Sequence, residues 1–552
     1  MIHLNTKASI VVTRLVLLAL AVALLLPGTT RAATPGISGG TGPTASFRLT
    51  AAADYITQPD GMQIYSWGYG CVVGSAPTFV PAAFATLGFC PTMQVPGPTL
   101  VVTEGQVVSV TLTNNLPAGA GNTSIMFPGF QVCLGAVTSA GVCSAPVGAN
   151  GVPGILAQEA TPGGSVTYSF VATTPGTRAY YSGTQSDLQI EMGLYGAIVV
   201  LPKNPPSNCS PLGSDIGQKL GVGNPGADLR LAPAAYDHPE TCYDREYLFQ
   251  WMELDPRIHR QAEQQAQAIA TCPASNPTPS VPCPTTLAVK TEPYHPAYFL
   301  VNGRSMPDDM DPSYAPNYPH QPYNGNPHMH PGDLVLVRTI GQGRWEHPFH
   351  EHGNHVRILA RDGNLILSQN DPQTAAGNQP RLAGRMEFTT DTYPGQSYDG
   401  IFYWSGKGLG WDIYGHTPAY PAANVPCIPD ANGYYTSNPS APNYYEWCAD
   451  HNIPLEANPV GQIGAGGPAT QFDPLIATNG LWYNGTPYLS QDAVNRNRGT
   501  APLPPGGALQ NPPAESGIAF MWHSHNEREI TTNDVFPGGM LMMMLVDPPV
   551  WY

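Results

Sequence analysis

The chain has 552 residues, a net charge of −16 and 42% hydrophobic residues, with 59 glycines and 60 prolines. This acidic balance argues against nucleic acid and anionic membranes as partners, because clustered Lys and Arg supply affinity for both. The Gly and Pro content predicts many loops, while the hydrophobic content is sufficient for sizeable β cores.

The first 32 residues resemble a secretory signal. Lys7 and Arg14 precede an apolar run at 15–26, and small residues follow around Ala33. The run is shorter than the roughly 20 residues that a membrane span requires, and no comparable run follows, so no integral membrane protein is expected. Residues 1–32 are therefore a predicted signal peptide. Its removal takes away three cations and changes the net charge to about −19. We expect a secreted or periplasmic protein.

All ten cysteines follow this segment, and they form five neighbouring pairs along the chain. In an exported protein an even count favours disulfides, and no CxxC spacing suggests a thiolate metal site. Sequence alone does not determine connectivity. The simplest pairing is Cys71 with Cys90, Cys133 with Cys143, Cys209 with Cys242, Cys272 with Cys283, and Cys427 with Cys448.

Residues 40–203 are predicted to form a first β domain. Val108 to Thr113 alternate between apolar and polar residues, the period of a strand with one buried face. A closing strand is expected at 196–201. Residues 204–242, where proline and glycine recur, are predicted to be a linker.

Residues 243–552 are predicted to form a second β domain with two interruptions. A helix is expected at 257–270, where Gln and Ala are frequent. Residues 410–515 are predicted to be a loop-rich insertion with a covering or interface role. The expected strands are at 245–251, 298–303, 334–338, 401–404 and 540–546.

Two histidine clusters lie far apart in the second domain, His347-Pro-Phe-His350-Glu-His352 and His523-Ser-His525. Alternate side chains of a strand point to one face, so each His-x-His element presents two imidazoles side by side. Two such strands can converge on one metal. The candidate metal ligands are His350, His352, His523 and His525, together with His347. Ser524 stands between two of them, where a blue copper site would need a thiolate.

Four motifs in this order resemble the multicopper oxidase, or laccase-like, superfamily: Pro96–Leu100, Gly193–Ala197, His347–Gly353 and Phe520–His525. The resemblance covers nearly all of the chain beyond the signal segment and is closest to the two-domain members. It implies an all-β fold of two cupredoxin-like Greek-key β-sandwiches, with the insertion in the second. Such relatives are commonly trimers that hold metal between neighbouring subunits, so a homotrimer is expected by analogy.

The resemblance also implies which copper ligands are missing. The family's trinuclear centre uses four His-x-His pairs, and the two expected from the first domain are replaced by Met126–Gly129 and Tyr180–Gln185. At the type 1 copper, His347 and Met540 match the family, whereas Ser524 replaces the cysteine and Glu529 the second histidine. We therefore expect no blue copper and no laccase-type turnover.

The remaining imidazoles suit one Cu(II) or Zn(II) ion, with one position open to water or a small-molecule ligand. Nearby carboxylates are predicted to orient them or to bind the metal themselves: Glu351, Glu527, Glu529 and Asp534. The favoured hypothesis is an exported copper-binding protein. Two alternatives remain open: an oxidoreductase acting on a small substrate or metal ion, and a metal-free structural or surface-interaction scaffold.

Three further segments remain, and each of the first two allows two interpretations. His320, His328 and His330 suit either a solvated loop or an additional surface copper site. The methionine-rich run 540–545 is expected to be a core strand rather than a Cu(I) site. Tyr180 and Tyr181 are expected to be packing groups.

Overall fold

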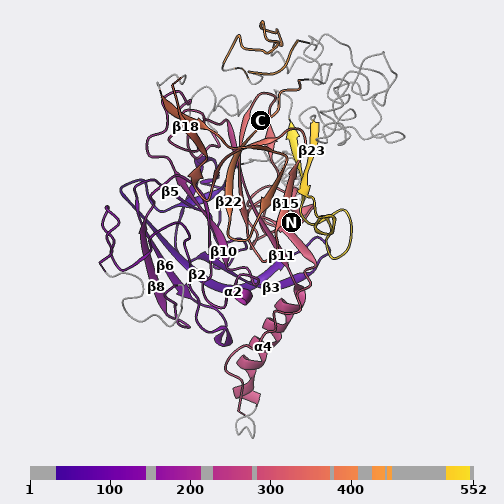
Figure 1. Cartoon of the computed structure of the whole chain (residues 1–552). Coiled ribbons are helices and arrows are strands. Elements are labelled where there is room, and N and C mark those ends of the chain that lie inside the picture. The colour runs from indigo at the N-terminus through magenta and orange to yellow at the C-terminus, as the bar shows by residue number, and fades with distance from the viewer. Residues whose placement is uncertain are drawn as a thin grey trace, which may run out of the picture. The chain divides into compact units, whose positions relative to one another are not determined.

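The computed structural model describes residues 33–144, 157–212, 228–275, 282–372, 378–407, 426–439, 441, 444–449 and 518–546. The predicted signal segment and most of the predicted insertion lie outside these ranges. Strands dominate the described part, which confirms the all-β class with two cupredoxin-like sandwiches (Figure 1). None of the helices in these ranges combines the length and apolar character needed to cross a bilayer.

The first sandwich consists of two five-stranded sheets with the orders β4-β1-β5-β10-β9 and β3-β2-β6-β8-β7. The predicted alternation lies in β6, where Val108, Val110 and Leu112 are fully buried between partly exposed neighbours. The bounds are β1 Gly36–Ser38, β2 Thr44–Thr57, β3 Gln63–Cys71, β4 Thr78–Val80, β5 Leu100–Thr103, β6 Val107–Asn114, β7 Cys133–Leu134, β8 Ser165–Val171, β9 Gly176–Tyr181 and β10 Tyr195–Leu201.

The second sandwich pairs a seven-stranded sheet, β12-β11-β14-β22-β16-β17 with β20 on β16, with the five-stranded sheet β13-β24-β23-β15-β21. All five predicted strands are present. The bounds are β11 Arg245–Leu254, β12 Tyr298–Val301, β13 His328–Met329, β14 Leu334–Gly341, β15 His347–Glu351, β16 Val356–Arg361, β17 Asn364–Leu365, β20 Met386–Glu387, β21 Thr389–Thr392, β22 Ser397–Tyr403, β23 Ile518–Ser524 and β24 Leu541–Val546; β18 Leu367–Asp371 and β19 Gln379–Leu382 form a separate pair.

The predicted helix is α4, Pro256–Ser275. Ile258 and Ala262 join the buried core of the first sandwich, so the helix belongs to the second half of the chain and covers the first. In the described ranges the other α-helix is α2, Ser186–Gln189, and the 3-10 turns are η1 Ala82–Phe84, η2 Ala118–Ala120, η3 Asp308–Met310 and η7 Glu527–Ile530.

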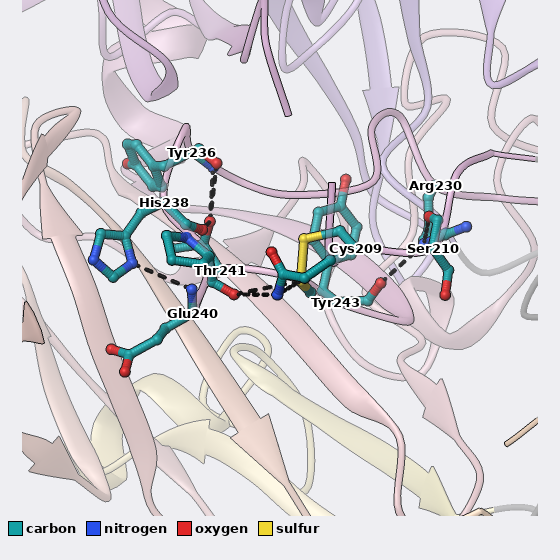
Figure 2. Close-up of a disulfide and its surroundings, with 11 residues drawn as sticks. Cys209, Ser210, Arg230, Tyr236, His238, Glu240, Thr241 and Tyr243 are labelled. Atoms are coloured by element: carbon teal, nitrogen blue, oxygen red, sulfur yellow. Dashed lines mark hydrogen bonds between the residues drawn. A yellow bond between two sulfur atoms is a disulfide. The ribbon is translucent and has the colours of Figure 1, made fainter. Parts of the chain in front are cut away.

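All five disulfides follow the predicted pairing. The bond between Cys209 and Cys242 ties the residues after β10 to those before β11, within the segment predicted to be a linker (Figure 2). Hydrogen bonds of Thr241 with Tyr236 and His238 order the chain beside this disulfide (Figure 2).

A buried polar network joins the two sandwiches. Arg338 on β14 forms ion pairs with Glu246 at 2.9 Å and with Asp399 at 3.5 Å. The Asp399 carboxylate also accepts hydrogen bonds from the amide and hydroxyl of Thr177 on β9 and from the hydroxyl of Tyr236. Because buried charges need partners, this network fixes β9 of the first sandwich against β14 and β22 of the second.

Replacement of Asp399 by alanine should therefore destabilise the protein strongly. Arg338 would lose one of its two carboxylate partners, and removing one member of a buried pair costs about 3–5 kcal/mol. Denaturant unfolding measures this loss. The control is Glu240→Ala, which breaks an ion pair with Arg381 at the surface and should cost under about 1 kcal/mol. Equal losses in the two variants would contradict this role of the network.

Candidate metal centre

The two histidine clusters meet through the register of β15 and β23. These antiparallel strands place His350 opposite His523 and Phe349 opposite Ser524 (Figure 1). Beyond the end of β15, the amide of His352 still donates to the carbonyl of Met521, at 3.1 Å. Because strand side chains alternate, the imidazoles of 350, 352 and 523 share one face, while Phe349 and Ser524 point to the other.

Three imidazoles form a compact group. One ring nitrogen from each of His350, His352 and His523 lies within 4.8 Å of the others. The Nε2 atoms of His352 and His523 are 3.3 Å apart. All three residues are buried, with exposed fractions of 6–7%. The convergence predicted for the two His-x-His elements is therefore present in the fold for these three residues.

Hydrogen bonds orient two of the rings. Nδ1 of His350 lies 2.7 Å from the hydroxyl of Thr389 on β21, and Nδ1 of His523 lies 2.7 Å from the carbonyl of Ser524. Nδ1 of His523 must donate to that carbonyl, so its Nε2 carries the lone pair. The Nε2 atoms are then the ones available to a cation, since second partners of this kind set the ring orientation of metal-binding histidines.

The surroundings keep these imidazoles neutral. Burial, followed by repulsion from His523 and His525, lowers the pKa of His350 to about 4. Burial and the neighbouring histidines lower the pKa of His352 to about 3, and burial also lowers the pKa of His523. A neutral imidazole is the form that binds a metal ion.

His525 borders this group without joining it. Its ring centroid is 4.8 Å from that of His350, but its side chain is 54% exposed and Nδ1 lies 3.6 Å from Glu527. The fourth predicted ligand is thus at the solvent side of the three-histidine group.

His347, also predicted as a ligand, lies apart from the group. It is fully buried, with Nε2 3.0 Å from Glu253 and Nδ1 2.9 Å from Glu529. Burial opposes the charged ring, but the hydrogen bonds to the two carboxylates outweigh it and raise the pKa of His347 to about 9. The hydroxyl of Ser524 donates to the same oxygen of Glu529. His347 therefore forms an ion pair with each carboxylate, and we call Glu253, His347 and Glu529 the buried triad.

The carboxylates predicted to assist the metal ligands have other partners. Glu351 is buried on the opposite face, where it accepts from Thr390 and Tyr398. Glu529 belongs to the buried triad. Glu527 faces His525, and Asp534 pairs with Arg528.

The other candidate segments are mostly core. His328, on β13, and His330 are buried, and His330 contacts Arg245, so for these two residues both the solvated-loop and the surface copper interpretations are wrong. The methionine-rich strand is confirmed as core, through Met540, Met542 and Met544. Tyr180 is a packing group, with its hydroxyl bound to the carbonyl of Pro98.

Two residues of the site were not predicted, Glu253 and Thr389. Glu253 could have been suspected, because an acid inside the apolar strand sequence 245–254 must find a partner when buried. Thr389 carries no such signal, since a threonine in a strand is common.

The family-model match includes two of the four sequence motifs, Pro96–Leu100 and Gly193–Ala197. Residues 91–205 match the family model described as multicopper oxidase. The multicopper oxidase MCE of Talaromyces pinophilus is 32% identical over 110 residues, 20% of this chain and 16% of that protein. The laccase abr2 of Aspergillus fumigatus is 32% identical over 118 residues, 21% of this chain and 17% of that protein. Residues 91–205 therefore resemble a multicopper oxidase domain, and the chain spans less than a fifth of the length of the curated relatives that it matches. Copper is the metal that this superfamily implies.

Solved structures of the superfamily are similar at low identity. The multicopper oxidase mgLAC is 15% identical, with a TM-score of 0.41, and the match covers 91% of this chain and 85% of that one. The blue copper oxidase from Nitrosomonas europaea is 14% identical, with a TM-score of 0.41 and coverage of 90% and 85%.

The buried triad makes stability depend on pH in a defined direction. The pKa of His347 is higher in the folded state than in the unfolded state. The charged ring therefore contributes its full stabilisation of the fold below the unfolded-state pKa of about 6.5, and this stabilisation is lost as the pH rises through about 9. A His347→Gln variant should be less stable than the wild type by about 3 kcal/mol at pH 6, and the gap should narrow above pH 9.

Urea unfolding at pH 6, 8 and 10 measures this gap, and all other titrating groups are common to both proteins. The control is His238→Gln, whose ring contacts the carbonyl of Pro380 outside the triad. A gap between wild type and His347→Gln that stays constant from pH 6 to pH 10 would rule out a charged His347.

Proposed function

We propose that this protein is an exported copper-binding protein whose single metal site consists of His350, His352 and His523, and that it performs no laccase-type turnover. The observation that carries the proposal is the 3.3 Å separation between Nε2 of His352 and Nε2 of His523. Metal–nitrogen bonds of about 2.0–2.1 Å at a tetrahedral angle require nitrogen atoms about 3.3–3.4 Å apart.

The donor set fits copper. Three neutral imidazoles suit Cu(II) and also Zn(II), and the superfamily favours copper. Bound copper would supply a Lewis acid and a one-electron redox centre. The protein's own residues hold and orient the imidazoles, through Thr389 and the Ser524 carbonyl, and exclude most water from them.

The absence of laccase-type turnover follows from residue chemistry. Ser524 occupies the position of the thiolate, and its hydroxyl donates to Glu529. The places where the resemblance puts the first domain's imidazoles are occupied by Met126–Gly129 and Tyr180–Gln185, which contain no histidine. Reduction of oxygen to water needs four electrons and several coupled metals, whereas the described residues bring together one group of three histidines. Export is supported by the signal-like residues 1–32 and by five disulfides.

A second candidate is an oxidoreductase that acts on a small substrate at the same site. The exposed side chain of His525, beside His350, favours it because it leaves one side of the metal site next to solvent. Oxygen consumption with phenols, Fe(II), Mn(II) or Cu(I), lost in His352→Ala, would establish this activity.

Copper loading followed by metal analysis tests the main proposal. The wild type should hold one equivalent of copper without an intense blue band, because the site has no thiolate. His352→Ala and His523→Ala should lose this copper. The matched control His320→Ala should keep it, since His320 binds the carbonyl of Met93 elsewhere. A wild type without bound copper, or variants that retain it, would refute the site, and a blue band would contradict the predicted ligands.

A further inference from the structure

We propose that the buried triad, acting through Ser524, positions His523 for metal binding. This inference rests on the proposed function, because it assigns a role to residues behind the same site. It makes His347 and Glu529 positioning residues and not metal ligands.

Every oxygen of the two triad carboxylates accepts a hydrogen bond. Glu253 receives His347 on Oε2, and the amides of Arg344 and Trp345 and the hydroxyl of Tyr294 on Oε1. Glu529 receives His347 and the hydroxyl of Ser524 on Oε2, and the side-chain amide of Asn526 on Oε1. Donors surround both carboxylates, and the His347 ring between them, whose pKa is raised, donates from both nitrogens.

A doubly donating imidazole has no lone pair for a metal. The triad is therefore closed to cations and acts as a fixed, fully hydrogen-bonded support. It joins β11, through Glu253, with the start of β15, through His347, and with η7, through Glu529. These three elements are distant in the sequence, and the triad fixes them relative to one another.

Ser524 connects this support to the metal site. Its hydroxyl donates to Glu529 on the inner face of β23, and its carbonyl accepts from Nδ1 of His523. The orientation of this one residue therefore sets the direction of the His523 ring. The carbonyl of Met540 accepts from the amide of Ser524, and the carbonyl of Glu529 accepts from the amide of Met540, which closes the loop around it.

Glu529, which contacts β23 on its inner face, can thus control the orientation of His523, whose imidazole lies on the opposite face. If Glu529 loses its charge, the His347 and Ser524 donors compete for a weaker acceptor, and the peptide that carries the Ser524 carbonyl is then held only by the backbone bond from the amide of His525 to the carbonyl of Pro348. The separation of the His352 and His523 Nε2 atoms, now 3.3 Å, should then increase.

The test compares Glu529→Gln with the control Glu240→Gln. Both remove one negative charge, but Glu240 pairs with Arg381 at the surface, outside the triad and the three-histidine group. Copper affinity, measured by competition with a chelator, should fall about 10- to 100-fold in Glu529→Gln and change little in the control. The electron paramagnetic resonance spectrum of bound Cu(II) should change in Glu529→Gln alone.

Crystal structures of the metal-free wild type and Glu529→Gln provide a readout independent of copper. The separation of the two Nε2 atoms should be larger in the variant by about 1 Å or more. This increase is about half the length of a metal–nitrogen bond. Unchanged separation overturns the inference. If the wild type binds copper and Glu529→Gln binds it with the same affinity, the inference is also overturned. The proposed function then remains intact.

A wild type that binds no copper defeats the proposed function, and the crystal structures still decide the inference. If Glu529→Gln does not fold, Ser524→Ala replaces it, because it removes only the hydroxyl that links the triad to β23. Copper affinity and Nε2 separation equal to those of the wild type in Ser524→Ala overturn the inference.

Discussion

The pairing of β15 with β23 is the constraint on which both sides of the site depend. Because His350 stands opposite His523 and Phe349 opposite Ser524, one face of the sheet carries imidazoles and the other carries core residues and the triad. A shift of the register by one residue would exchange these faces, placing histidines in the core and aromatic rings at the site. The packing of Phe349 and Trp522 against Phe249 prevents that shift, since three large rings must stay buried.

Histidines within six residues of one another have opposite protonation states because their surroundings differ. His350 and His352 are buried beside other imidazoles, which lowers their pKa values to about 4 and about 3. His347 is buried between two carboxylates, which raise its pKa to about 9. Burial acts in the same direction on all three rings, so the neighbouring charges decide the outcome. A neutral ring can bind a cation, whereas a charged ring already serves as one for its carboxylate partners.

The sequence predicted the fold class, the disulfide pairing and the approach of the two His-x-His elements, because each follows from local spacing: alternation in β6, neighbouring cysteines, and the two-residue period of a strand. The prediction also included His347 among the ligands. His347 and His350 are three residues apart, so their side chains point to opposite faces of the strand, and the prediction placed them on the same face. That His347 turns inward depends on Glu253, a residue 94 positions away whose contact no local pattern reports. The same holds for Thr389, which reaches His350 only through the pairing of β15 with β21.

The short contact between His352 and His523 is compatible with a shared proton as well as with a shared metal ion, and the rest of the site favours the metal. A lone hydrogen-bonded pair needs only two rings, yet His350 is held by Thr389 with a ring nitrogen within 4.8 Å of a ring nitrogen of each of the other two. Burial and the neighbouring rings disfavour protonation of the three imidazoles, as their lowered pKa values show. A metal cation that accepts all three lone pairs at once is not disfavoured in this way. The negative charge of the chain adds a long-range attraction for such a cation. The same burial and repulsion that keep the rings neutral therefore support the proposed copper site.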